Sequence, residues 1–320
     1  MDVAGGIHRI DTDFYGRVNS LFLLVGANKT MLIDTGVGST PGEYLVPYLR
    51  DHAIDAPIDY VLNTHADLDH VGGNAAVAEL FPDSAQICHA LDQEWIDNTD
   101  ALIEERYDEY AALGIGETVE TKAFLKDITG AKATDTLVTG GEKFSLSDDW
   151  QVEILHTPGH SFGHIAVWDQ RSSTLIIGDA VLSDGLYMAD GSPAFPPTYR
   201  YVDDYVATID KLAALNAEVL LCSHYPTMQG DEVAAFFDGS SAYVDRVEQA
   251  VSSVLGSSDE PMSLRSIIAA TSPELGPWGE DAALSLKFPI LGHLERMIAR
   301  GEVERVVVDG TPCFARLANG

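Results

Sequence analysis

Four side chains that can bind a metal ion are crowded into one short segment of this sequence. The segment reads NTHADLDHVGG, residues 63–73, and it places His65, Asp67, Asp69 and His70 within six positions. Such a group is costly to assemble in a pocket unless a cation neutralises it. A divalent cation there would support hydrolysis, because it lowers the pKa of a bound water and polarises the bond under attack. A solvated acidic turn is the alternative interpretation.

The elements around this segment suit a binding loop. The stretch IDYVLNTH, residues 58–65, predicts a buried strand that ends at the first histidine. Ligand-binding side chains collect on loops at strand ends in layered α/β folds. Gly72 and Gly73 allow a sharp turn, and NAAVAELFP then predicts a helix that ends at Pro82.

Three more metal-binding side chains are predicted at the ends of other strands. His160 follows a Pro-Gly turn in HTPGHSFGH, Asp179 ends the apolar run TLIIGD, and His224 follows the strand VLLC. A carboxylate in the position of Asp179 needs a partner if it is buried. All three signals thus lie at strand-to-loop junctions, where ligand-binding side chains tend to collect.

Together these motifs resemble the metallo-β-lactamase superfamily over roughly residues 7–230. The first motif of that family is usually HxHxDH, and here it reads HADLDH, so Asp67 replaces the second histidine. The TPGH and GD motifs and the last histidine follow in the family's order. The matching residues are His65, Asp69, His70, His160, Asp179 and His224.

The resemblance implies a site with two divalent metal ions and a hydroxide that bridges them. The hydroxide would attack a small ester, thioester or lactone without a serine or cysteine nucleophile. Asp69 and Asp179 would be the carboxylates of the catalytic centre. The implied ligands are His65, Asp67 and His160 for one ion, Asp69, His70 and His224 for the other, and Asp179 as a bridge.

Asp67 leaves the metal and the reaction class open. A carboxylate makes the site harder and more anionic than an imidazole would. Zinc accepts aspartate and is favoured, whereas iron or manganese is the alternative, since flavodiiron proteins of the same superfamily carry a glutamate at this position. A di-iron redox enzyme is therefore one alternative, although no flavin-binding domain is recognisable. A nuclease or phosphodiesterase and a non-catalytic binding protein are the others.

Three residues are expected to lie next to the metal ligands and to support them without binding metal. Asp34, in MLIDTG, matches a recurrent family position and is expected to hold the metal loops by hydrogen bonds. His156 and His164 flank His160, and the outer histidines of this pattern are usually supporting or structural in the family.

The substrate contacts are the least specific prediction. The segment GLYMADGSPAFPPTYRYVDDY follows the Asp179 strand and could form a wall of the pocket, which makes Tyr187, Tyr199 and Arg200 candidate substrate contacts. An acidic helix or helix pair predicted over residues 92–113 could lie over the same pocket. A structural loop that packs on the sandwich is the alternative.

The order of elements predicts an α/β fold, an αββα sandwich of the metallo-β-lactamase type. Two halves of the sequence each combine strand pairs with helices, which suits two sheets packed face to face with helices outside. This catalytic domain is predicted to span residues 1–256. Residues 257–320 read as helices followed by a hairpin with an Asp309-Gly310 turn, which predicts a small winged-helix-like domain.

The composition narrows the partners. The chain has 320 residues and a formal net charge of −31, from 50 acidic and 19 basic residues. Nucleic acids and anionic membranes need a basic surface and are therefore disfavoured as partners. A small-molecule substrate is expected instead. The winged-helix-like C-terminal region makes a homodimer reasonable. The sequence shows no transmembrane run and no secretory signal, so a cytoplasmic protein is expected. The acidity would also suit a salt-rich cytoplasm.

Overall fold

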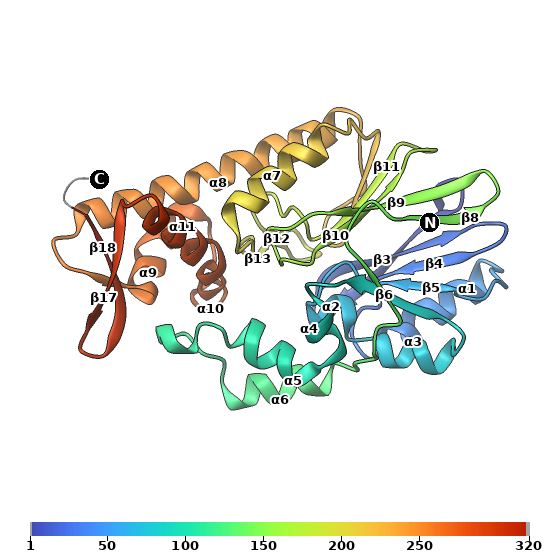
Figure 1. The fold of residues 1–320 in the computed structure, drawn as a ribbon, viewed down its shortest axis with the longest axis horizontal. Helices are drawn as coiled ribbons and strands as arrows, with labels where there is room; N and C mark the ends of the chain where they lie inside the picture. The colour runs from blue at the N-terminus through green and yellow to red at the C-terminus, as the bar shows by residue number, and fades with distance from the viewer. Residues whose placement is uncertain (1, 318–320) are drawn as a thin grey trace.

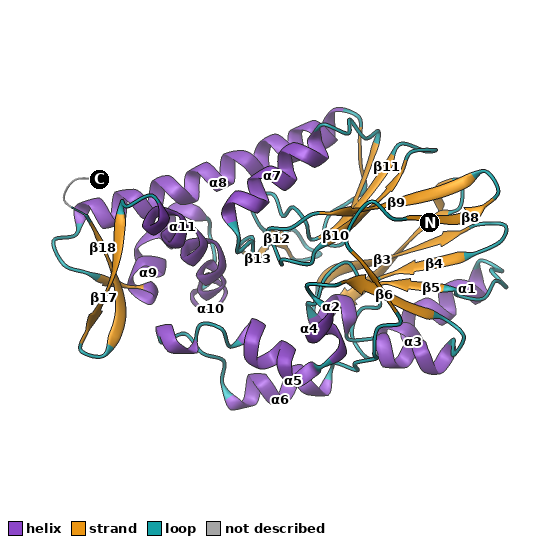
Figure 2. Ribbon diagram, in the orientation of Figure 1, coloured by secondary structure: helices purple, strands orange, loops and turns teal. Residues whose placement is uncertain are grey.

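Two β-sheets packed face to face form the centre of the computed structural model, which describes residues 2–317 (Figures 1 and 2). The first sheet has the strand order β1-β2-β3-β4-β5-β6-β7. Its strands are β1 (Asp2–Ala4), β2 (Ile7–Phe14), β3 (Arg17–Val25), β4 (Thr30–Ile33), β5 (Tyr60–Leu62), β6 (Ala85–His89) and β7 (Thr136–Val138).

The second sheet has the order β15-β14-β11-β10-β9-β8. Its inner face shares one apolar cluster with the first sheet, in which Phe22, Ile154 and Ile176 are fully buried. Its strands are β8 (Lys143–Ser147), β9 (Trp150–His156), β10 (Ile165–Asp169), β11 (Thr174–Gly178), β14 (Val219–Cys222) and β15 (Met228–Gln229).

Helices cover the outer faces of both sheets, so the predicted αββα sandwich is confirmed (Figure 2). Leu45, Leu49 and Val77 pack on the outside of the first sheet, and Tyr205 and Val247 belong to the cluster on the second. The covering elements are η1 (Pro41–Leu45), α1 (Val46–Asp51), α2 (Leu68–Val71), α3 (Asn74–Leu80), α7 (Val202–Ala213) and α8 (Asp231–Ser257).

The strand directions explain why the predicted ligands can meet. β5 runs parallel to β4 and β6, and β14 runs parallel to β11. Parallel strands place their carboxyl ends at the same edge of a sheet. The segments that follow Leu62, Gly178 and Cys222 therefore leave the two sheets at neighbouring edges, and each carries predicted ligands.

Residues 92–128 form an insert of short helical segments rather than the helix or helix pair predicted over residues 92–113. Asn98 ends α4, and its side chain accepts hydrogen bonds from the backbone at the start of α5. Gly114, with φ of 77°, ends the short helical turn over Ala111–Leu113. The segments are α4 (Gln93–Asp97), α5 (Thr99–Ala101), η2 (Leu102–Tyr107), η3 (Ala111–Leu113) and α6 (Val119–Asp127).

The C-terminal region is helical and ends in a hairpin, as predicted. The long helix α8 leads into it and ends at Ser257 (Figure 1). Leu264, Leu294 and Phe314 belong to the same apolar cluster as α7 and α8, so the region shares the core of the second half. Its elements are β16 (Met262–Ser263), α9 (Leu264–Leu275), α10 (Glu280–Ala283), η4 (Leu284–Leu286), α11 (Lys287–Ala299), β17 (Val303–Val308) and β18 (Thr311–Arg316).

A small hairpin, β12 (Leu186–Tyr187) with β13 (Pro193–Phe195), completes the described elements. Within residues 2–317, every helix is too short or too polar to cross a bilayer.

A charged cluster ties α8 to α11. Glu248 accepts hydrogen bonds from Arg296 (2.9 Å) and Arg300 (2.7 Å), and the His293 ring lies 3.4 Å away. The contact with His293, together with the two arginines, outweighs partial burial and lowers the pKa of Glu248 to about 2, from an ordinary value of 4.5. The ionised Glu248 therefore stabilises the fold fully above pH 4.5, and this contribution is lost as the pH falls toward 2.

The Glu248→Gln variant tests this cluster. We expect it to lower the free energy of unfolding by about 1–2 kcal/mol at pH 7, the range for a partly exposed charged network. Urea unfolding of both proteins from pH 7 to pH 3 should show the difference shrinking below pH 4.5. A difference that stays constant over this range would contradict the assignment.

Candidate metal centre

The structure brings the predicted ligands together at the edge where the two sheets meet. Two triads have ligand atoms that all lie within 4.8 Å of one another, and they are the two sets that the family resemblance implies. The first triad is His65, Asp67 and His160, and the second triad is Asp69, His70 and His224. Asp179 lies between them, because it also forms a group with His65 and His70.

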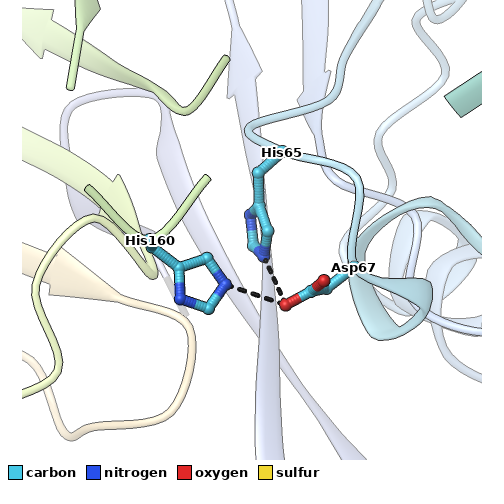
Figure 3. A group of neighbouring side chains, drawn as sticks. All are labelled: His65, Asp67 and His160. Atoms are coloured by element: carbon cyan, nitrogen blue, oxygen red, sulfur yellow. Dashed lines mark hydrogen bonds and ion pairs between the residues drawn. The ribbon is translucent and has the colours of Figure 1, made fainter. Parts of the chain in front are cut away.

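The first triad joins the loop after β5 to the loop after β9. Asp67 precedes α2 in an extended conformation. Its Oδ2 lies 2.8 Å from His160 Nε2 and 3.5 Å from His65 Nε2, and all three side chains point toward one another (Figure 3). Both histidines are buried, whereas Asp67 keeps 17% of its side-chain surface exposed. One face of the triad is thus open to solvent.

The second triad places Asp69 and His70, both on α2, opposite His224 after β14. Asp69 Oδ2 lies 3.6 Å from His224 Nε2 and 3.9 Å from His70 Nε2. Asp179 Oδ2 lies 3.2 Å from His224 Nε2 and 3.6 Å from His70 Nε2. Two carboxylates and two imidazoles therefore surround one small volume.

The donor set fits a divalent cation. His65 Nε2, His70 Nε2 and Asp179 Oδ1 are buried without a hydrogen-bond partner. Buried polar atoms almost always have a partner, so each of the three needs an explanation. Imidazole nitrogens and carboxylate oxygens are the ligand atoms that zinc and related metals accept. Divalent cations bonded to these atoms would satisfy them.

The protonation states of His65 and Asp179 suit a metal site, whereas the neighbouring carboxylates, Asp179 foremost, outweigh burial and raise the pKa of both His70 and His224 while no cation neutralises them. Burial, reinforced by His70, lowers the pKa of His65 to about 3, so its ring is neutral. Burial alone would raise the pKa of Asp179, but His224 and His70 outweigh it and hold that pKa well below the usual range. A neutral imidazole and an ionised carboxylate are the forms that bind metal.

Asp34 orients His70 and the start of the loop after β5 through hydrogen bonds. Its Oδ1 accepts a hydrogen bond from the Thr64 backbone (2.7 Å), and its Oδ2 accepts one from the Thr64 hydroxyl (2.8 Å). The same Oδ2 lies 2.8 Å from His70 Nδ1. This contact makes Nδ1 the protonated nitrogen of His70 and leaves Nε2 free to bind metal.

Removal of this carboxylate should weaken metal binding. We expect Asp34→Ala to lower zinc affinity about 10–100-fold, the usual cost of losing a partner behind a metal-binding histidine. Titration with zinc in the presence of a competing chelator measures the change. The Asp34→Asn variant, which keeps one acceptor oxygen, should lose less. Unchanged affinity in Asp34→Ala would show that Asp34 does not position His70.

The two outer histidines of the TPGH region have different surroundings. His164 stacks on His65 at 4.8 Å, and its Nε2 accepts a hydrogen bond from the Asp179 backbone at 3.3 Å. His164 therefore contacts two of the candidate ligand residues, His65 and Asp179. His156 instead stacks on His89 at 4.2 Å and contacts the Phe162 carbonyl at 2.8 Å. His156 supports the loop rather than a ligand.

The three candidate substrate contacts lie in unlike places. Tyr187 is 37% exposed, and with His224 it lines a cavity of about 920 Å³. Tyr199 is fully buried, and its hydroxyl contacts His293 Nε2 at 3.0 Å. Arg200 is buried between Glu109 and Glu295. The last two side chains are engaged within the fold, so a substrate contact stays a prediction for Tyr187 alone.

Arg106, on the insert, contacts the first triad and is not among the residues predicted from the sequence. It is 3% exposed, and its Nε and Nη2 donate to the two oxygens of Asp67 at 2.5 and 3.0 Å. Burial alone would raise the pKa of Asp67, but Arg106 and His160 outweigh it and hold that pKa well below the usual range. A signal was present, because Arg106 is the one Arg or Lys between residues 51 and 121.

Comparison with known proteins gives relatives over most of the chain. The chain is 28% identical to Acyl-coenzyme A thioesterase MBLAC2 from Bos taurus in an alignment of 302 positions, which covers 84% of this chain and 95% of that protein. It is 25% identical to a Hydroxyacylglutathione hydrolase from Methylococcus capsulatus over 285 residues, 87% of this chain and 90% of that protein.

Solved structures share the fold over nearly the full length. A metallo-beta-lactamase family protein from Thermus thermophilus superposes with a TM-score of 0.76 and 20% identity, covering 98% of this chain and 99% of that one. The shared fold thus includes the C-terminal region.

The family model described as Metallo-beta-lactamase superfamily matches residues 15–224, more than half of the chain. The matched stretch contains both triads and Asp179. The chain therefore belongs to the metallo-β-lactamase superfamily.

Proposed function

We propose that this protein is a metal-dependent hydrolase that cleaves thioesters. The observation that carries the metal dependence is the convergence of three buried, unpaired ligand atoms, His65 Nε2, His70 Nε2 and Asp179 Oδ1. Two triads that share Asp179 between them suit two divalent ions. Zinc is the first candidate, because it accepts both histidine and aspartate.

The chemistry needs little from the protein beyond the metal ligands. A bound divalent cation lowers the pKa of a water and polarises the carbonyl under attack. Asp69 keeps 17% of its side-chain surface exposed and lies 3.6 Å from His224 Nε2. The Asp69 carboxylate therefore reaches solvent, and the oxygen that does not bind the metal could accept the proton of the attacking water and pass it to solvent.

A thioester is favoured over an oxygen ester by two arguments. A thiol has a pKa near about 8.5, so a thiolate can leave without being protonated by the enzyme. In addition, two relatives that match more than four fifths of this chain are an acyl-coenzyme A thioesterase and a hydroxyacylglutathione hydrolase by name.

The cavity beside His224 offers room for the acyl group. Its volume of about 920 Å³ lies within the range for sites that hold small-molecule ligands. Tyr48, Met188 and Tyr187 line it together with His224, which is the one candidate ligand in its lining, so apolar surface extends outward from that histidine. Chain-length preference among acyl substrates would reflect this cavity.

A substrate panel tests the proposal. Zinc-loaded protein is incubated with short and long acyl-coenzyme A thioesters, a hydroxyacylglutathione, the matched oxygen esters, a lactone and a phosphodiester, and release of free thiol or acid is followed. We expect thioesters to be cleaved fastest, and chelation of the metal to stop the reaction. Protein that holds its metal but cleaves no thioester would overturn the proposal.

A further inference from the structure

The two triads differ in whether a positively charged side chain contacts their ligand atoms. Arg106 Nε and Nη2 donate to Asp67 Oδ1 and Oδ2, so both oxygens of that carboxylate are engaged. Arg106 Nη2 also lies 3.1 Å from His160 Nε2, and Nη1 donates to the His160 carbonyl. Two of the three ligand groups in the first triad are thus in contact with a guanidinium.

The second triad has no such cation beside it among the described residues. Its close neighbours are carboxylates and imidazoles, with Asp69 and Asp179 facing His224 and His70. The unpaired atoms His70 Nε2 and Asp179 Oδ1 lie on this side of the centre. A cation here would meet two free ligand atoms, whereas a cation in the first triad would meet one free atom, His65 Nε2, and two groups already in contact with Arg106.

We propose that Arg106 competes with a metal ion for the first triad, so that the two triads bind divalent cations with unequal affinity. An arginine stays protonated, and a bidentate pair with a carboxylate is among the strongest charge-assisted hydrogen bonds. An ion that enters the first triad must take Asp67 away from Arg106 and then sit beside the guanidinium charge. The first ion therefore binds at the second triad with Asp179, and Arg106 is the positioning residue that delays the second.

The inference rests on the proposed metal dependence but not on the substrate. It also accounts for the insert, because η2 carries Arg106 into the centre, where Trp95 and Phe288 lie about 6 Å from the guanidinium carbon. The aspartate that replaces the usual histidine is the group that Arg106 holds, so the departure from the family motif and the arginine form one unit.

Stepwise metal titration tests this competition. Metal-free protein is titrated with zinc against a chelator of known affinity, and the two dissociation constants are fitted. We expect the second to be weaker than the first by about tenfold or more, since a hydrogen bond between charged groups is worth at least one decade of affinity. In Arg106→Met the second ion should bind more tightly and the two constants should converge.

Trp95 supplies a second readout that does not depend on activity. Because Arg106 lies 5.9 Å from its ring, displacement of the guanidinium should change Trp95 fluorescence at the second ion and not at the first. A Trp95→Phe protein identifies the part of the signal that comes from this residue.

Two further variants separate the possible causes. Arg200→Met removes another buried arginine that pairs with two carboxylates, Glu109 and Glu295, and it should leave the gap between the two constants unchanged. Arg106→Lys keeps a charge but loses the bidentate pair, so it should narrow the gap partway. This variant decides the matter if Arg106→Met does not fold.

The outcomes are distinct. Two ions that bind the wild-type protein with equal affinity would overturn the inference and leave the proposed function standing. A stepwise titration that Arg106→Met, or Arg106→Lys in its place, leaves unaltered would also overturn it, because the asymmetry would then have another origin. Failure to bind any divalent cation would instead contradict the proposed function itself.

Discussion

The Asp179→Asn variant is expected to lose about 10³-fold or more in kcat/KM for thioester hydrolysis, because metal catalysis supplies several kcal/mol of transition-state stabilisation. Asp179 Oδ2 lies between His224 and His70, and its Oδ1 has no partner in the protein. Asparagine keeps the shape but removes the charge that both triads share. Metal content after dialysis should fall together with activity.

The control for this variant is Asp210→Asn, an exposed carboxylate on α7. It changes the net charge by the same amount far from the ligands and should keep both metal and activity. If Asp179→Asn retained wild-type metal content and turnover, Asp179 would not be a ligand, and the assigned metal centre would be wrong.

The second large effect is expected on stability, from Gly159→Ala. Gly159 has a φ of +139°, and a Cβ there would lie 2.5 Å from Tyr205 Cα in α7. Its carbonyl also accepts hydrogen bonds from the backbone of Arg200 and Tyr201. The strained backbone and the overpacking should together lower the free energy of unfolding by about 2–5 kcal/mol. Because His160 follows directly, the ion of the first triad should be lost as well.

Gly191→Ala is the matched control, since Gly191 also has a positive φ (+84°) but has no heavy atom within 4 Å of the added Cβ. It should bear only the backbone cost, about 1 kcal/mol. Urea unfolding of the two variants compares them directly. If Gly159→Ala were no less stable than Gly191→Ala, close packing of α7 against the loop of His160 would not matter.

The candidate ligands could be predicted because they match family motifs that begin at or shortly after strand ends in the sequence. Apolar runs such as TLIIG and VLLC end at Asp179 and before His224, and the parallel pairing of β11 with β14 brings those ends together. Asp34 likewise directly follows a strand, β4, and its Oδ2 lies 2.8 Å from His70 Nδ1. Local periodicity thus located the strand ends, and the resemblance to family motifs identified the candidate ligands at this edge.

The residues that the sequence did not predict are placed by long-range packing. Arg106 reaches Asp67 across 39 positions of the chain, and nothing in the local pattern of the insert fixes the direction of its side chain. Tyr199 and Arg200 were expected at the pocket because aromatic and basic residues suit a binding loop. Both instead bond to residues of α11, His293 and Glu295, whose position depends on how the C-terminal helices pack.

The most direct test of the central claim, metal-dependent thioester hydrolysis, is one assay on one preparation. Metal-free protein is reloaded with increasing zinc, and thiol release from an acyl-coenzyme A thioester is measured at each metal content beside the matched oxygen ester. We expect thioester cleavage to rise with bound zinc and to exceed cleavage of the oxygen ester throughout. Cleavage that is independent of bound metal, or absent from fully loaded protein, would contradict the claim.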